Sequence, residues 1–320
     1  MNIGAATVAI VSLAAKLAAA PPEVGELLFH ESFEDTAWAS RGWYDGPHME
    51  IVEDSDAPHG DRVNLWHWPH AGATGPSGGS ARLHLPPLED VTMSFFLRVS
   101  DNWLWTGRPY HPHMFSLLTD VDWEYVGPAY THLTTYAEVV NGVPRLALQD
   151  GRNVDTSHVE ADLTAETEAR AIAGCNGDAD GHGEGDCYRS GDNWVNGKVW
   201  ESGRVYLRAE AGLHDQRNWH QIHARFRLNS VGDGVTRRDG KLQMWFDGEL
   251  IIDVQDAVLR TSMHPGMKFN QFLMGPHYGP GVPHPQSMWI DDLKIWASPA
   301  SPTAVRAASW GQAKVPPPGP

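Results

Sequence analysis

Apolar and polar residues alternate one by one through the stretch NWHQIHARFRLN, residues 218–229. A period of two places successive side chains on opposite faces of a strand, so this stretch is predicted to be a strand with one buried face. The apolar face carries Ile222, Ala224, Phe226 and Leu228, and the polar face carries His223, Arg225 and Arg227. Strand patterns continue at 241–246, 250–254, 269–275 and 287–296, and Asp247-Gly248 is typical of a type I′ hairpin turn. These segments together predict an antiparallel meander.

The first half of the chain has the same character. Val91, Met93, Phe95, Leu97 and Val99 form one apolar face, and further strands are predicted at 27–33, 61–68, 114–119, 132–140 and 144–149. The dipeptide Asn141-Gly142 predicts a tight hairpin turn between the last two. Many short strands separated by Gly- and Pro-rich turns, with almost no helical pattern, indicate an all-β antiparallel sandwich of the jelly-roll kind.

The composition along the chain suggests its domain organisation. Residues 1–20 are apolar and end in small residues, which is typical of a signal peptide. Residues 21–297 are then expected to form one β domain. The polar, Gly- and Asp-rich segment 151–217 is predicted to be a long insertion in it, and the Ala/Pro-rich residues 298–320 a disordered tail.

Composition narrows the possible partners. The formal net charge of −16 argues against nucleic acid as a partner, and no stretch beyond residue 20 is long and apolar enough to span a membrane. The chain has 14 Trp, a residue whose ring can stack on the apolar face of a sugar. The two cysteines, Cys175 and Cys187, lie close together in the sequence, which is compatible with a disulfide in an oxidising compartment. We therefore expect a monomeric protein that is secreted, periplasmic or at the cell surface, with a polysaccharide partner that can be anionic.

The segments WHQIHARFRLN, DGKLQMWFDGELI and FNQFLMGPHYGPGVPHPQSMWIDDLKIW resemble the C-terminal half of concanavalin A-like lectin and glucanase jelly rolls. Within that superfamily they look most like polysaccharide lyases of the alginate and glucuronan lyase type. The resemblance is clearest over residues 218–296. It implies a curved sheet that holds a glycan on its concave face, and cleavage of a uronate-containing polysaccharide by β-elimination.

Several His, Tyr and Arg residues lie on the predicted strands and loops, and β-elimination needs this mixture of a base, an acid and groups that stabilise negative charge. The candidate catalytic residues are His113, Tyr136, Arg145, Arg225, His277 and Tyr278, with Arg145 and Arg225 expected to hold the uronate. The candidate substrate-binding residues are Arg108, Tyr110, His132, Gln149, His223 and Arg227. A lyase predicts that His113, Tyr136, Arg145 and Arg225 line one groove.

Two other functions stay open. A non-catalytic carbohydrate-binding or structural surface protein would expose Trp side chains without a basic cluster beneath them. A glycoside hydrolase of the laminarinase type would instead use Asp120, Asp122 and Glu124, whose spacing places three carboxylates on one side of a strand. That reading resembles an acidic motif of the same superfamily, but Asp120 stands where the motif has Glu.

Two calcium sites are conceivable. Cys175 and Cys187 can form a disulfide around a loop whose acidic and amide residues resemble the first half of a calcium-binding loop; the candidate ligands are Asn176, Asp178, Asp180, Glu184 and Asp186. In the superfamily that the chain resembles, a calcium ion often bridges the first and last strands. Glu31, Glu34, Asp291 and Asp292 would lie at that position.

Overall fold

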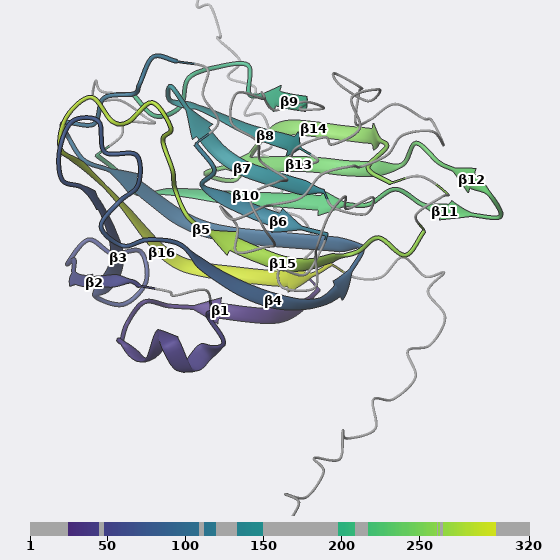
Figure 1. Cartoon of the computed structure of the whole chain (residues 1–320), viewed down its shortest axis with the longest axis horizontal. Helices are drawn as coiled ribbons and strands as arrows, with labels where there is room; N and C mark the ends of the chain where they lie inside the picture. Colours follow the sequence, from purple (N-terminus) through teal and green to yellow (C-terminus); the bar gives the residue numbers. More distant parts are fainter. Residues whose placement is uncertain are drawn as a thin grey trace, which may run out of the picture.

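The computed structural model describes residues 25–44, 48–108, 112–119, 133–149, 198–208, 217–260, 262 and 265–298, apart from the side chains of Gln149 and Lys198. These residues form the predicted antiparallel jelly-roll sandwich, in which a six-stranded sheet lies across an eight-stranded one (Figure 1). A separate two-stranded hairpin, β11 (Val231–Gly232) and β12 (Val235–Thr236), projects at one end of the molecule.

The eight-stranded sheet has the order β14-β13-β10-β5-β16-β3-β2, and β1 also pairs with β16. Its strands are β1 (Glu26–Glu31), β2 (Glu50–Glu53), β3 (Arg62–Trp68), β5 (Asp90–Val99), β10 (His220–Arg227), β13 (Gly240–Phe246), β14 (Glu249–Ala257) and β16 (Gln286–Ala297). On one side β16 pairs with β5 along most of its length. On the other side residues 286–290 pair with β3 and residues 293–297 pair with β1. The sheet therefore has an opening beside Asp291 and Asp292, between the end of β1 and the start of β3.

The six-stranded sheet has the order β4-β15-β6-β7-β8-β9. Its strands are β4 (Ala81–Leu88), β6 (Phe115–Leu118), β7 (Thr134–Val140), β8 (Val143–Gln149), β9 (Lys198–Glu201) and β15 (Phe269–Met274). Register partners in adjacent antiparallel strands point to the same face of a sheet. One row on the face away from the core therefore consists of Arg82, Leu273, Ser116, Tyr136 and Ala147.

The core fills the space between the two sheets, and the predicted apolar face of residues 91–99 lies in it. Val91, Met93, Phe95, Leu97 and Val99 are all buried, and the ring of Phe95 stacks on that of Phe115 at 4.0 Å between centroids. The predicted core face of β10 is buried as well. Alternation thus identified the inward residues because each strand has a single face toward the opposite sheet.

The two predicted hairpin turns are confirmed. Asn141 and Gly142 have φ of 51° and 79°, and Asp247 and Gly248 have φ of 49° and 77°. Positive φ at both central residues is the requirement of a type I′ turn, which Asn-Gly and Asp-Gly meet at low cost.

The prediction of one continuous meander from residue 218 to residue 296 is wrong. β10, β13 and β14 are adjacent, but β15 crosses to the other sheet, and β16 returns to lie between β5 and β3. Sequence pattern did not predict β2, β4 or β9. The sequence of β4 contains two prolines, and β9 lies inside the segment predicted to be an insertion.

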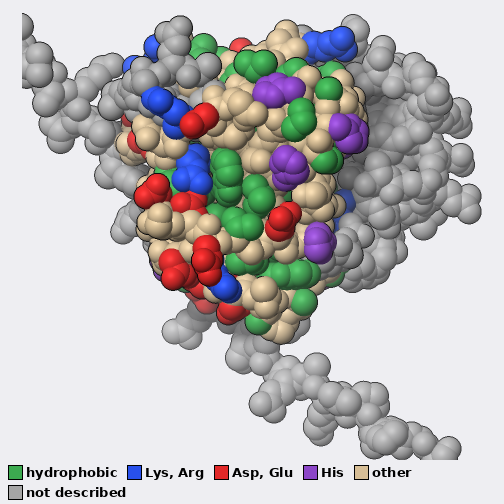
Figure 2. Space-filling model, turned by 90° about the vertical axis from the view of Figure 1, so that its left-hand side faces the viewer, with side chains coloured by type: hydrophobic (Ala, Val, Ile, Leu, Met, Phe, Trp, Pro, Cys, Tyr) green, Lys and Arg blue, Asp and Glu red, His purple; other side chains and the backbone are tan. Residues whose placement is uncertain are grey.

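Among the described residues, no helix is long and apolar enough to cross a membrane. The predicted signal peptide and almost all of the predicted tail lie outside the described residues. Figure 2 shows the left-hand end of the molecule in Figure 1, where several histidine side chains lie among hydrophobic ones at the surface.

Candidate functional site

The outer face of the six-stranded sheet carries a group of polar side chains. On β7, Ala137 and Val139 belong to the core, so Tyr136 and Glu138 point to the opposite face. Glu138 pairs in register with Arg145 of β8, which brings that guanidinium to the same face. Tyr136 and Arg145 therefore lie on the same face of the sheet, in diagonal register positions.

Two histidines lie at the end of this face. The loop after β15 runs beside the segment before β6, because Gly275 N donates to Met114 O (3.0 Å) and His277 N donates to Pro112 O (2.7 Å). The His113 ring lies 5.2 Å from the Tyr136 ring and 6.3 Å from the His277 ring, measured between centroids. His113, Tyr136 and His277, called here the His–Tyr cluster, come from segments distant in sequence.

His113 has an uncommon backbone conformation, with φ of 50°. A non-glycine residue pays on the order of 1 kcal/mol for the left-handed region, and such residues concentrate at functional sites. The two hydrogen bonds that flank His113 hold this conformation. The strain is an observation that distinguishes this histidine from an ordinary loop residue.

The cluster offers both partners for proton transfer. The surroundings of His277 remove part of the hydration of its ring, and this loss lowers the pKa below the usual value, although the side chain remains solvent-exposed. A histidine with a lowered pKa is neutral at pH 7 and can accept a proton. Tyr136, whose phenol can donate a proton, is 5% exposed.

Arg145 does not present a bare positive charge. Its Nε donates to Glu138 Oε1 at 2.6 Å, and its Nη1 lies 3.7 Å from Glu201 Oε1. Glu138 is 1% exposed and Arg145 is 5% exposed, so the pair is buried together. The expectation that Arg145 binds a uronate carboxylate needs correction, because two carboxylates already neutralise its charge.

Sequence reasoning missed three polar residues on this face, because it did not predict β4 and read β6 and β15 only as strands. Arg82 is 2% exposed and its Nη1 donates to Gln271 Oε1 at 2.7 Å. Within the described part of the chain, Ser116 Oγ and Gln271 Nε2 are buried and make no hydrogen bond. Buried polar atoms of this kind call for an explanation, and a polar ligand on this face would supply partners. The signal for Arg82 and His84 is the alternation in ARLHL.

Arg225, His223 and Arg227 do not belong to this site. They lie on β10, in the other sheet, and point away from the core because Ile222, Ala224 and Phe226 fill it. Arg225 makes a bidentate pair with Asp90 at 2.9 and 2.6 Å. The prediction that Arg225 shares a groove with Tyr136 is wrong, since the whole sandwich separates the two.

Tyr278 is wrongly assigned as a proton donor or acceptor. It is 4% exposed, and its ring packs against those of Trp68 and Trp103 at 5.5 and 6.0 Å. Burial raises the pKa of Tyr278 far above its usual value, and the nearby Glu138 charge adds to this effect. Its hydroxyl makes no hydrogen bond to any described residue. Tyr278 is therefore a core residue.

The remaining candidates are placed only in part. Arg108 is exposed beside the β7–β8 turn, where Asn141 Nδ2 donates to its carbonyl oxygen at 3.2 Å. Outside the described residues lie Tyr110, His132, the acidic run Asp120, Asp122 and Glu124, and the whole loop from Cys175 to Cys187 with its candidate calcium ligands; the side chain of Gln149 is likewise not described. These residues stay predictions.

The described tryptophans do not form an exposed stacking platform. The large hydrophobic residues exposed in the described part of the chain are Leu27, Leu104, Val199, Val205 and Val235, and none is a tryptophan. Trp43, Trp66, Trp68, Trp103 and Trp245 are instead buried. Four of these belong to the hydrophobic core, and the other described tryptophans apart from Trp245 are half-buried.

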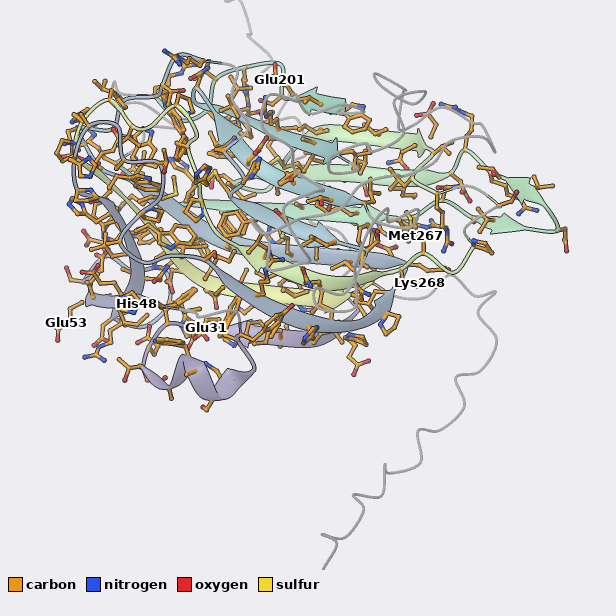
Figure 3. The ribbon with its side chains drawn as sticks, in the orientation of Figure 1. Glu31, His48, Glu53, Glu201, Met267 and Lys268 are labelled. Atoms are coloured by element: carbon orange, nitrogen blue, oxygen red, sulfur yellow. The ribbon has the colours of Figure 1, made fainter. Side chains whose placement is uncertain are left out.

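The structure removes Glu31 from the candidate calcium ligands between the first and last strands. Glu31 lies at the end of β1 beside the 3₁₀ helix η1 (Ala37–Arg41), and Figure 3 labels it there. Its two oxygens accept hydrogen bonds from the Phe33 amide, the Trp43 indole and the Arg41 guanidinium. These donors already satisfy the Glu31 carboxylate, so it does not fit a calcium site with Asp291 and Asp292.

No protein-family model matches the chain, and no curated protein matches it. Solved structures do match. Alginate lyase vAL-1 from Chlorella virus is 11% identical, with alignment over 85% of this chain and 100% of that one and a TM-score of 0.50. The PL-14 alginate lyase from Aplysia kurodai is 9% identical over 85% of this chain and 100% of that one, with a TM-score of 0.48. A mutant of alginate lyase Aly36B in complex with alginate tetrasaccharide is 11% identical over 84% and 92% of the two chains, with a TM-score of 0.44. The first of these likenesses confirms the predicted resemblance at the level of the fold.

Proposed function

We propose that this protein is a lyase that cleaves a uronate-containing polysaccharide by β-elimination on the outer face of the six-stranded sheet. The single observation that carries the proposal is the His–Tyr cluster, in which His113 lies 5.2 Å from Tyr136 and 6.3 Å from His277. The lyase-like fold supports a polysaccharide as the substrate class.

The cluster supplies a base and an acid for the elimination. A neutral imidazole of His113 or His277 takes the proton from C5 of the uronate, and the electrons of that C–H bond form a double bond between C4 and C5. The bond between C4 and the glycosidic oxygen breaks, and the phenol of Tyr136 gives its proton to the leaving oxygen. A base and an acid positioned in this way each contribute on the order of 10²–10⁴-fold in rate.

The carboxylate of the uronate must be neutralised for its C5 proton to become acidic. We assign this role to Arg82 together with Gln271, because Arg82 lies in the same register row as Tyr136 and its Nη1 donates to Gln271 Oε1 on the same face. Arg145 has the supporting role of holding Glu138 buried beside the cluster.

The test compares two tyrosines that each lose only a hydroxyl. The full-length protein is incubated with uronate polysaccharides, and the ultraviolet absorbance of the unsaturated product is followed. Tyr136→Phe is expected to lower kcat by at least about 100-fold, whereas Tyr278→Phe should keep the wild-type rate within about twofold. Activity lost in Tyr278→Phe and kept in Tyr136→Phe would refute the site.

The histidines are tested in the same way. His113→Gln and His277→Gln should each reduce the rate, and the matched change His67→Gln on β3 should not. A flat absorbance trace for the wild-type protein across all uronate polysaccharides, with glycan binding retained, would replace the lyase with a non-catalytic carbohydrate-binding protein.

A further inference from the structure

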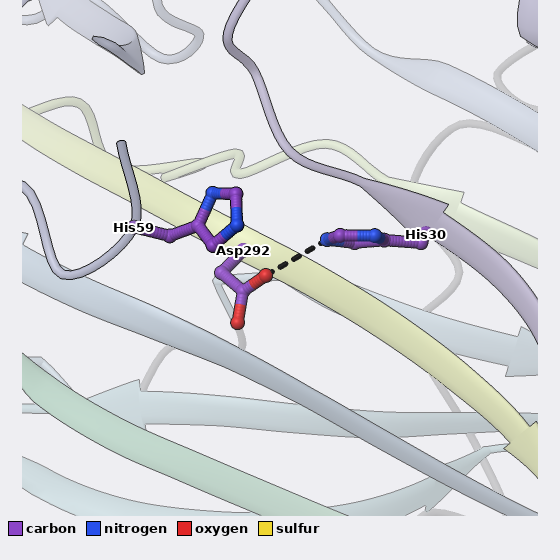
Figure 4. Close-up of side chains that lie close together, drawn as sticks. All are labelled: His30, His59 and Asp292. Carbon is purple, nitrogen blue, oxygen red and sulfur yellow. Dashed lines mark hydrogen bonds and ion pairs between the residues drawn. The ribbon is translucent and has the colours of Figure 1, made fainter. Parts of the chain in front are cut away.

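Two histidines and a carboxylate meet on the eight-stranded sheet, at its opening between β1 and β3. They are His30 of β1, His59 of the loop before β3, and Asp292 of β16. Within this set each residue offers one ligand atom, and these atoms all lie within 4.8 Å of one another (Figure 4). The three residues are 29 or more positions apart in sequence, so the fold alone brings them together.

The backbone orients Asp292 toward the opening. β16 is irregular between Asp291 and Lys294, and Asp292 has φ of 50°. Because of this irregularity, the two consecutive residues Asp291 and Asp292 have different roles. Asp291 is buried and accepts hydrogen bonds from the backbone N–H groups of His59 (2.8 Å) and Asp292 (2.7 Å). Asp291 thus anchors the loop that carries His59, and holds this loop close to Asp292.

The two oxygens of Asp292 have different partners. Asp292 Oδ1 lies 2.8 Å from His30 Nε2, while Lys294 Nζ donates to the other oxygen, Oδ2, at 2.6 Å. The His59 ring lies 5.8 Å from the His30 ring and at 79° to it. A metal-bound carboxylate that uses one oxygen commonly has its second oxygen hydrogen-bonded, which is the part that Lys294 plays here.

Glu34 stands next to the set. Its Oε1 lies 4.0 Å from His59 Nδ1, and its carboxylate accepts hydrogen bonds from the backbone N–H groups of Asp61 and Arg62. The carboxylate occupies the space that a side chain at Gly60 would fill, since an added Cβ would meet it at 2.1 Å. Glu34 is therefore held beside His59, where it can accept a hydrogen bond from a metal-bound water.

We infer that His30, His59 and Asp292 form a binding site for a divalent transition-metal ion, with Zn²⁺ as the ion that best fits these ligands. Two imidazole nitrogens and a carboxylate oxygen are ligands that Zn²⁺ takes readily, whereas Ca²⁺ prefers oxygen ligands throughout. With metal–ligand distances of about 2.0–2.1 Å, tetrahedral ligands lie about 3.3 Å apart. His30 Nε2 and Asp292 Oδ1 lie 2.8 Å apart, so an ion between them would separate these two atoms slightly, while the exposed His59 ring would turn toward them.

Such an ion would join three segments at a place where the sheet lacks strand pairing. It would link β1, the loop before β3, and β16, and it would stabilise the folded protein in proportion to its affinity and concentration. The site is separate from the His–Tyr cluster, which lies on the other sheet. The inference therefore does not rest on the proposed lyase function.

The experiment uses the full-length protein after treatment with a chelator and removal of that chelator. Zn²⁺ is titrated by calorimetry, and the melting temperature is recorded with and without Zn²⁺. We expect one site and a rise in melting temperature. His59→Gln and Asp292→Asn should each weaken Zn²⁺ binding at least tenfold. The matched variant His67→Gln, which changes another histidine of the same sheet, should bind as the wild type does.

His59→Gln is the decisive variant, because it leaves the His30–Asp292 hydrogen bond in place and its melting temperature without metal should match that of the wild type. Zn²⁺ binding that stays unchanged in both His59→Gln and Asp292→Asn would overturn the site. A response to Ca²⁺ stronger than that to Zn²⁺, and lost in His59→Gln, would overturn the choice of ion.

Discussion

His223 should make the folded protein sensitive to mild acid. It is 7% exposed on the outer face of β10, between its register partners Ser94 and Trp245. Burial lowers the pKa of His223 to about 4, and the positive charge of Lys294 contributes. The folded protein therefore keeps this imidazole neutral at a pH where an unfolded chain protonates it.

Proton linkage gives the sign and the size of the change in unfolding free energy with pH. Above a pH of about 6.5, neither state binds the proton and His223 costs nothing. As the pH falls from about 6.5 to about 4, the unfolded state binds a proton that the folded state refuses, so stability is lost across this window. At pH 5 the loss is about 2 kcal/mol, and its limit below pH 4 is about 3.4 kcal/mol, from roughly 2.5 pKa units at about 1.4 kcal/mol each.

The measurement is urea denaturation of the wild type and of His223→Gln at pH 8 and at pH 5, with a chelator present. Lowering the pH from 8 to 5 should destabilise the wild type by about 2 kcal/mol more than it destabilises His223→Gln. This amount corresponds to about 4–8 °C in melting temperature. His67→Gln controls for the loss of a histidine elsewhere on this sheet. A difference that is the same at both pH values would refute the reasoning.

Three further comparisons test the packing. Glu138→Gln should cost about 3 kcal/mol, because it removes the nearer, buried carboxylate partner of Arg145 and leaves the more distant Glu201. Glu249→Gln at an exposed ion pair should cost less than about 1 kcal/mol, and equal costs in urea denaturation would contradict this. Gly142→Ala should destabilise the protein more than Gly234→Ala. Both glycines have positive φ, but only a Cβ at position 142 would lie 2.3 Å from a backbone oxygen. The melting temperatures of the two variants test this, and equal values would contradict it. Tyr278→Phe should leave the unfolding free energy unchanged or raise it by about 1 kcal/mol, because it removes a buried hydroxyl that has no hydrogen bond among the described residues. A large decrease in the unfolding free energy would show that the hydroxyl has a hydrogen-bond partner.

Because Glu138 and Arg145 are buried as a pair, a loss of activity in an Arg145 variant does not by itself show contact with substrate. Arg145→Ala would abolish activity by destabilising the sheet that carries Tyr136, whether or not Arg145 touches substrate. The paired change of both residues to uncharged ones of similar size is the informative variant, because it removes the charge without leaving a buried carboxylate.

The sequence by itself determined the local structure. Period-two alternation identified the strands at 91–99 and 220–227 with their core faces. Asn141-Gly142 and Asp247-Gly248 specified the turns between β7 and β8 and between β13 and β14. These features depend on contacts between residues near one another in the chain and on burial of a single face, which the order of residues encodes directly.

Only the tertiary structure decided which strands are neighbours. Arg225 and Arg145 looked equivalent as basic residues on polar strand faces, yet β10 and β8 belong to different sheets and the two side chains point to opposite sides of the sandwich. Tyr136 and Tyr278 looked equivalent too, but β7 carries Tyr136 on the outer face of its sheet, whereas the loop after β15 carries Tyr278 into the core. Likewise, His30, His59 and Asp292 meet only because β16 pairs with β3 along one half and with β1 along the other. Alternation tells which residues face outward from a strand, but the side of the molecule that this face covers depends on long-range strand pairing, which no local pattern records.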